Sequence, residues 1–184
     1  MTINDSYAQR SKSDTIEIKR LFPGPIERVF AYLTVAEKRA KWLAGGDDLG
    51  TKAGQKFILL FQHDTLSALE SDTLAQHKAG DCASNVESKC TLEAIDPPNS
   101  LTMSWGESFG EASEVTFSLL EQGDKVLMTI THRKLADEAL MIDVSAGWHA
   151  HADIMVDVLE GKTARAFWAN HARLDTEYRQ RLKV

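Results

Sequence analysis

The chain has 184 residues, of which 43% are apolar, and its 21 Lys and Arg face 27 Asp and Glu, a formal net charge of −6. This length predicts one domain with its own core. The acidic balance excludes the basic face that nucleic acid or an anionic membrane requires. No apolar run reaches a membrane span, the first residues lack an apolar signal core, and Cys82 and Cys90 lack C-x-x-C spacing. We therefore expect a reduced, cytoplasmic protein.

Residues 1–14 are mostly polar and offer little apolar surface to bury, so we expect them to form a flexible tail. The side chains then alternate in character, with Ile16, Ile18 and Phe22 on one side and charged residues on the other. This period of two predicts a half-buried strand over 15–22.

The rest of the chain predicts further elements from the same kinds of pattern. Pro25 is well placed to open a helix, and turn residues separate the later apolar runs into antiparallel hairpins. Residues 62–85 mix leucines with turn residues and form a long excursion. The expected elements are helices over 25–33 and 35–42, strands over 57–61, 86–95, 101–105, 115–120 and 126–132, and helices over 135–159 and 163–182.

This order of elements predicts an α+β fold. A curved antiparallel sheet of about six strands would wrap around the long helix, and an extra C-terminal helix would follow. The single domain would cover residues 15–182. A strongly curved sheet tends to leave an apolar space beneath the helix, and small ligands bind in such spaces.

Several segments carry a resemblance to a known family. "IKRLFPGPIERV" (18–29), followed by Trp42, resembles the opening of the START-like (SRPBCC) helix-grip superfamily. Further segments of the chain resemble one branch of this superfamily, the family homologous to the C-terminal domain of the activator of heat-shock protein 90 ATPase. These are "IDPPNSLTMSW" (95–105), "SEVTFSL" (113–119), "ITH" (130–132), "AGWHAHADIM" (146–155) and "FWANHARLDTEY" (167–178). The resemblance covers about residues 15–182 and departs from the family at 62–85.

The resemblance implies the helix-grip fold and leaves three functions open. Members of the superfamily bind lipids, hormones or polyketides, a few are cyclases or hydrolases, and the named branch takes its name from a co-chaperone. We expect first a non-enzymatic protein that binds a small apolar molecule between the sheet and the long helix. The alternatives are a regulator of a chaperone ATPase and a cyclase or hydrolase of an apolar substrate.

Nine side chains are candidates for contact with such a ligand. Most of them are large apolar residues on the inward side of their elements, where they would either line a cavity or fill the core. The candidates are Arg20, Trp42, Phe57, Trp105, Phe117, Met128, His132, Trp148 and Met155.

Arg20 is a charged residue on the apolar side of the first expected strand. If buried, its guanidinium needs an acidic partner, either a carboxylate of the protein or an anionic ligand. Otherwise the side chain lies near the strand end and reaches water. His132, on the same side of its strand as Met128, either satisfies its hydrogen bonds within the core or orients the polar end of a ligand.

The remaining reactive residues give no sign of a catalytic or metal site. His149 and His151 are about 200° apart around a helix, so they cannot share one metal ion. No G-x-S-x-G motif or phosphate-binding loop is present, and Cys90 has the parity of a buried, inert thiol. We expect no cofactor. The apolar residues of the last helix either pack on their own domain or contact a second subunit in a homodimer.

Overall fold

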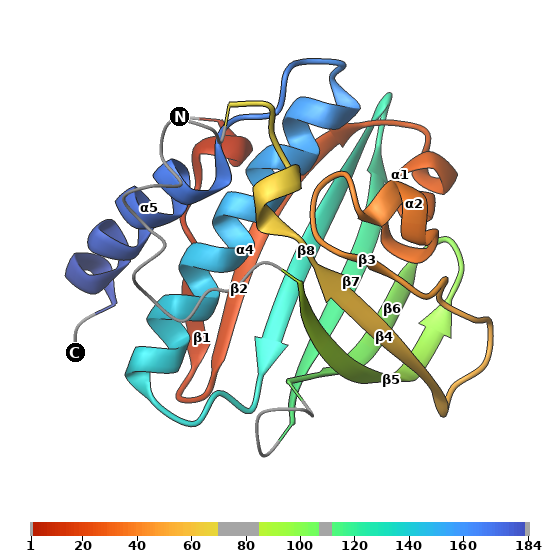
Figure 1. Cartoon of the computed structure of the whole chain (residues 1–184), viewed down its shortest axis with the longest axis horizontal. Helices are drawn as coiled ribbons and strands as arrows, with labels where there is room; N and C mark the ends of the chain where they lie inside the picture. Colours follow the sequence, from red (N-terminus) through yellow and green to blue (C-terminus); the bar gives the residue numbers. More distant parts are fainter. Residues whose placement is uncertain (1, 70–84, 107–111, 183–184) are drawn as a thin grey trace.

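The computed structural model describes residues 2–69, 85–106 and 112–182, and it consists of one curved antiparallel sheet with helices packed against it (Figure 1). The sheet has eight strands in the order β1-β2-β8-β7-β6-β5-β4-β3. The strands are β1 (Gln9–Lys12), β2 (Thr15–Pro23), β3 (Gly45–Gly46), β4 (Gln55–Phe61), β5 (Val86–Asp96), β6 (Ser100–Trp105), β7 (Ser113–Gln122) and β8 (Lys125–Arg133). The helices are α1 (Ile26–Thr34), α2 (Ala36–Arg39), α4 (Glu138–Leu159) and α5 (Phe167–Arg181), with short 3-10 turns at Ile3–Asp5 and His63–Thr65. The predicted α+β helix-grip fold is confirmed.

The six expected strands are all present, and two edge strands add to them. In β2, Ile16, Ile18 and Phe22 are buried, as the alternation predicts. The residues of β1 are all exposed, and β3 consists of two glycines paired with β4. Edge strands of this kind bury no face of their own, so they leave no hydrophobic period in the sequence.

The expectation of a flexible tail over residues 1–14 is wrong for its described part. Besides the pairing of β1 with β2, the Asn4 side chain donates to the carbonyl of Leu21 and accepts from its N–H. The backbone N–H of Ala8 donates to the hydroxyl of Tyr178 in α5. These partners are distant in sequence, and composition alone does not reveal them.

A buried arginine shapes the turn that follows the short helices. The helix expected over 35–42 is confined to α2, and Arg39 at its end is fully buried. Its guanidinium donates to backbone carbonyls, among them those of Ala44, Gly45 and Asp47. Burial lowers the pKa of Arg39 to about 10, which leaves it charged at neutral pH. The turn therefore places Leu43 and the backbone carbonyl of Trp42 next to α4.

The long helix α4 is buried on two sides. The side chain of Asp137 accepts the N–H of Leu140 and caps its first turn. One face of α4 packs on the sheet, whereas α5 covers part of the opposite face (Figure 1). Asp153 and Asp157 on this second face are therefore only 5% and 6% exposed. Among the described helices, none has the length and apolarity needed to cross a membrane.

The apolar face of α5 is covered within the chain. The buried side chains of this helix are Phe167, Trp168, Leu174 and Tyr178. Packing on its own domain, one of the two expected alternatives, is therefore what the structure shows. The predicted excursion over 62–85 contains the turn His63–Thr65, but residues 70–84, and Cys82 with them, lie outside the described residues.

Candidate functional site

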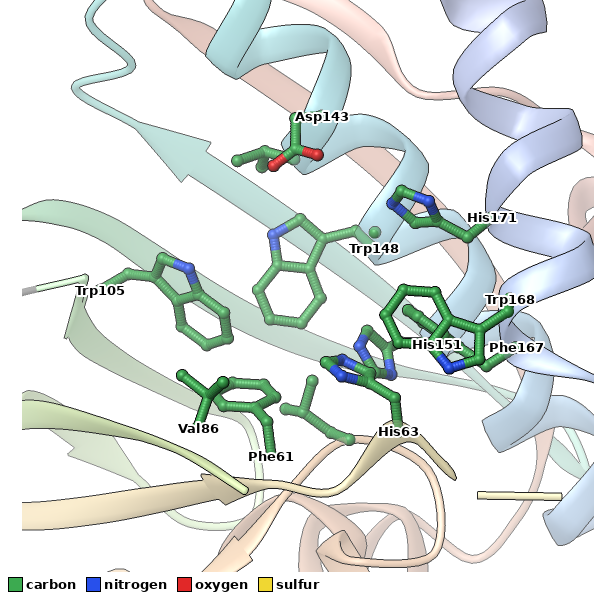
Figure 2. Close-up of a pocket in the computed structure, with 13 residues that line it drawn as sticks. Phe61, His63, Val86, Trp105, Asp143, Trp148, His151, Phe167, Trp168 and His171 are labelled. Atoms are coloured by element: carbon green, nitrogen blue, oxygen red, sulfur yellow. The ribbon is translucent and has the colours of Figure 1, made fainter. Parts of the chain in front are cut away.

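A cavity of about 340 Å³ lies between α4, the start of α5 and one end of the sheet. Figure 2 shows the 13 residues that line it. They come from the loop between α2 and β3, the ends of β4 and β6, the start of β5, the turn after β4, and from α4 and α5. The lining residues are Leu43, Phe61, His63, Val86, Trp105, Asp143, Val144, Gly147, Trp148, His151, Phe167, Trp168 and His171.

Aromatic rings form the wall nearest the sheet. Trp105 at the end of β6 packs against Trp148 of α4, with ring centres 4.8 Å apart and planes tilted by 51°. Phe61 at the end of β4 meets Trp105 edge to face at 5.7 Å. Rings held in this way keep their rotamers without a ligand, because each is packed against the next. The wall is therefore largely preformed.

The opposite wall combines histidines with the first turn of α5. His63 stacks on Phe167 with ring centres 4.4 Å apart and planes 24° apart, and His151 lies 4.6 Å from the same phenyl ring. His171 also stacks on Phe167, with ring centres 5.5 Å apart. The indole N–H of Trp168 donates to Asp64, which holds this turn of α5 beside the 3-10 turn after β4. Figure 2 shows these rings grouped on one side of the cavity.

Trp148 is positioned by a directed chain of hydrogen bonds. Its indole N–H donates to Nδ1 of His132 at 2.9 Å, so Nδ1 must carry the lone pair. Burial lowers the pKa of His132 to about 3, and the neutral ring therefore carries its proton on Nε2. Nε2 lies 2.7 Å from the hydroxyl of Ser113, which in turn donates to the carbonyl of Trp105. His132 is thus hydrogen-bonded directly to the indole of Trp148 and, through Ser113, to the backbone of Trp105.

These hydrogen bonds argue against a role for Ser113 as a nucleophile. A serine next to a histidine resembles the start of a hydrolytic dyad, in which the histidine accepts the serine proton. Here the indole of Trp148 forces the opposite tautomer, and His132 donates to Ser113 rather than accepting from it. Neither residue lines the cavity. The geometry therefore supports a structural role for the pair.

Arg20 meets a protein carboxylate, the first of its expected alternatives. It is fully buried, and Nε donates to Asp153 Oδ1 at 3.1 Å while Nη1 donates to the carbonyls of Ser6 and Lys19. The second oxygen of Asp153 accepts from Arg165, just before α5, at 3.1 Å. This network joins β2, α4 and α5. It lies away from the cavity, and the assignment of Arg20 to a ligand has no support in this placement.

His149 and His151 lie on different sides of α4, as their spacing predicts, and both are buried at 5% exposure. Nδ1 of His149 is 2.9 Å from the Tyr178 hydroxyl, and burial together with the positive charge of Arg20 lowers the pKa of His149 to about 3. Nδ1 of His151 is 2.7 Å from the carbonyl of Trp42. Among the described residues, no group of three or more His, Cys, Asp and Glu side chains is arranged to hold a metal ion.

The structure brings only part of the predicted candidate set to the cavity. Trp105 and Trp148 line it, and His132 lies directly behind Trp148. The other apolar candidates are fully or almost fully buried in the core and do not line the cavity: Trp42, Phe57, Phe117, Met128 and Met155. These residues belong to the hydrophobic core, and the cavity forms beside it, at the ends of β4 and β6 and the start of β5.

Sequence reasoning missed the histidine-rich wall. His63 stands in the excursion after β4, where no period indicates its direction. Phe167 and His171 fall on the apolar stripe of the last helix, but that stripe does not reveal what it packs against. Gly147, which directly precedes Trp148 in α4, was a usable signal, because a glycine inside a helix often marks space needed by another group.

Comparison with solved structures places the chain among proteins of the same fold. The solution structure of the protein encoded by gene BPP1335 from Bordetella parapertussis is 40% identical, with a TM-score of 0.76 over 94% of this chain and 88% of that one. CalU16 from Micromonospora echinospora is 19% identical, with a TM-score of 0.66 over 92% and 89% of the two chains. EF2215 from Enterococcus faecalis, described as a conserved protein of unknown function, is 15% identical, with a TM-score of 0.67 over 95% and 90%.

The family comparison is more specific than the fold. Among curated proteins, none matches the chain. The family model described as Activator of Hsp90 ATPase homolog 1-like protein matches residues 23–160, from the end of β2 to the end of α4. This range contains every strand of the sheet beyond β2 and the helix that the sheet grips. The chain therefore belongs to the Activator of Hsp90 ATPase homolog 1-like family.

Proposed function

We propose that this protein binds a small apolar molecule in the cavity between the sheet and α4 and does not transform it chemically. The observation that carries the proposal is the aromatic cavity itself, whose volume of about 340 Å³ lies in the usual range of small-molecule sites. Its walls consist mainly of tryptophan, phenylalanine and histidine rings, which suit a flat apolar ligand.

The polar groups around the cavity favour binding over catalysis. The Ser113–His132 pair has the tautomer that opposes proton abstraction, and Arg20 is occupied by Asp153. The cyclase or hydrolase alternative named its polar groups as Arg20 and His132, and neither reaches the cavity. A binding role requires only the preformed walls.

Regulation of a chaperone, the activity in the family's name, would require a docking surface instead of a cavity. Among the described residues, the large apolar side chains that are exposed stand on separate elements: Ile3, Val35, Leu69, Leu120 and Leu140. Such scattered residues are normal on a monomer surface. The cavity is therefore the better-supported functional feature.

Two measurements test the proposal. Native mass spectrometry of the gently purified protein is expected to show an excess mass that organic solvent removes, or else an empty protein that takes up the neutral fluorescent probe N-phenyl-1-naphthylamine with one saturable site. Leu120→Ala, which changes an exposed side chain on β7, is the control and should bind the probe like the wild type. Absence of both a retained mass and saturable binding would refute the proposal.

A further inference from the structure

The histidine wall determines which polar group a ligand needs. His151 is the better-defined partner, because its Nδ1 lies 2.7 Å from the Trp42 carbonyl, which can only accept a hydrogen bond. Nδ1 therefore carries the proton. Burial holds the pKa of His151 well below its ordinary value, so the ring is neutral. Its Nε2 is then a lone-pair acceptor on a residue that lines the cavity.

His63 has complementary properties. Its Nδ1 is buried and has no hydrogen-bond partner among the described residues. Burial lowers the pKa of His63 to about 4, so this ring is also neutral at pH 7. Because a buried N–H without a partner is more costly than a buried lone pair, the proton belongs on Nε2. His63 therefore offers a donor, and its ring centre is 5.2 Å from that of His151.

Among the described residues that line the cavity, none carries a fixed positive charge. No arginine or lysine is found among its described lining residues, and Asp143 is the one acidic side chain there. Figure 2 places Asp143 at the opposite end of the cavity from His63. A carboxylate or phosphate on a ligand would lose its hydration without gaining a cation as partner. Anionic ligands are thus disfavoured.

Building on the proposed function, we propose that the preferred ligand is an uncharged, flat aromatic molecule with a hydroxyl group, that is, a phenol. The hydroxyl donates to Nε2 of His151 and accepts from Nε2–H of His63. The rest of the molecule packs against the rings of Trp105 and Trp148. A hydroxyl can donate one hydrogen bond and accept another through a single oxygen atom.

The test uses four ligands that share one ring system: 2-naphthol, naphthalene, 2-methoxynaphthalene and 2-naphthoate. Binding is followed by quenching of tryptophan fluorescence, since three of the four tryptophans line the cavity. We expect 2-naphthol to bind about 2- to 12-fold more tightly than 2-methoxynaphthalene, which accepts but cannot donate, the range of one net hydrogen bond. 2-Naphthoate should bind more weakly than either.

The variant His63→Phe gives a second, independent readout. Phenylalanine keeps a flat ring for the stacks on Phe61 and Phe167 but removes the donor. We expect the preference for 2-naphthol over naphthalene, measured as the ratio of the two affinities, to fall by about 2- to 12-fold from its wild-type value. A loss of affinity for both compounds alike would refute the assigned role of His63.

The possible outcomes distinguish failure of the phenol preference from failure of the proposed binding function. If naphthalene or 2-naphthoate binds the wild-type protein as tightly as 2-naphthol, the hydroxyl preference is wrong and the apolar binding site stands. If none of the four compounds binds and N-phenyl-1-naphthylamine does not bind either, both the inference and the proposed function fail. If that probe binds and the four compounds do not, the phenol assignment alone is overturned.

Discussion

Gly147 offers a direct way to close the cavity without damaging the fold. This glycine lies inside α4 and lines the cavity, and a Cβ built on it meets no atom within 4 Å. Glycine within a helix costs about 1 kcal/mol relative to alanine, so Gly147→Ala should raise the free energy of unfolding by about 1 kcal/mol. For a chain of this size, that corresponds to a rise in Tm of about 2–4 °C.

Gly147→Leu extends the same change into the cavity. The added side chain gains the helix term and buries apolar surface, for a total of about 1–3 kcal/mol, because complete burial of a leucine contributes about 1.5–3 kcal/mol and this burial is partial. The side chain then occupies space that a ligand needs. We expect affinity for N-phenyl-1-naphthylamine to fall at least about tenfold while stability rises. Gly147→Ala should bind nearly as the wild type does.

Gly161 provides the control for the backbone. A Cβ there also meets no atom within 4 Å, but φ is +71°, so Gly161→Ala should lower stability by about 1–2 kcal/mol. Thermal unfolding and probe titration of the three variants check the reasoning. Destabilisation by Gly147→Ala would show that the space beside Gly147 is filled, and undiminished probe binding by a stable Gly147→Leu would show that ligands bind elsewhere.

Three further predictions concern the buried polar groups. Stability should fall as pH drops from about 7.5 to about 5, because histidines such as His132, with a pKa lowered to about 3, remain neutral when folded but gain a proton when unfolded. The unfolded chain then binds more protons, so stability rises with pH between about 3 and 6.5, by up to about 1.4 kcal/mol per pH unit for each such histidine; equal urea midpoints at the two pH values would contradict this. Arg20→Met should destabilise the fold by about 3–5 kcal/mol in urea unfolding because it removes one side of the buried pair with Asp153, whereas the exposed Arg179→Met should cost less than about 1 kcal/mol; similar losses in both would refute the buried network. A fluorophosphonate should leave Ser113 unlabelled, and an adduct on this serine by mass spectrometry would overturn the assigned tautomer of its histidine.

Elements that bury one face could be predicted from the sequence. The alternation of β2 and the apolar stripe of α1 repeat with the period of their own secondary structure, and that repeat is visible without knowledge of the fold. The ordered set of sequence motifs also indicated the family without knowledge of the fold. The strand alternation of β6 and the helical stripe of α4 also predicted that Trp105 and Trp148 point inward, because the direction of a side chain within its own element is local information.

The contacts of those inward residues follow from the packing of the elements in three dimensions. Arg20 had one local signal, its place on an apolar face, but its partner Asp153 is 133 residues away. The tail found its partners on β2 and α5, and two edge strands formed without a hydrophobic repeat. Such contacts depend on how the elements are packed, which periodicity does not encode.

The cavity, too, depends on how the elements pack together. Its walls join His63 from an irregular turn, Phe167 from the start of α5 and Trp105 from a strand end, and no two of these are near one another in the chain. The sequence supplied the aromatic and histidine side chains. Whether they fill the core or leave a space depends on where α5 docks against α4 and the sheet, so the position of the site and its hydrogen-bonding groups came from the tertiary structure alone.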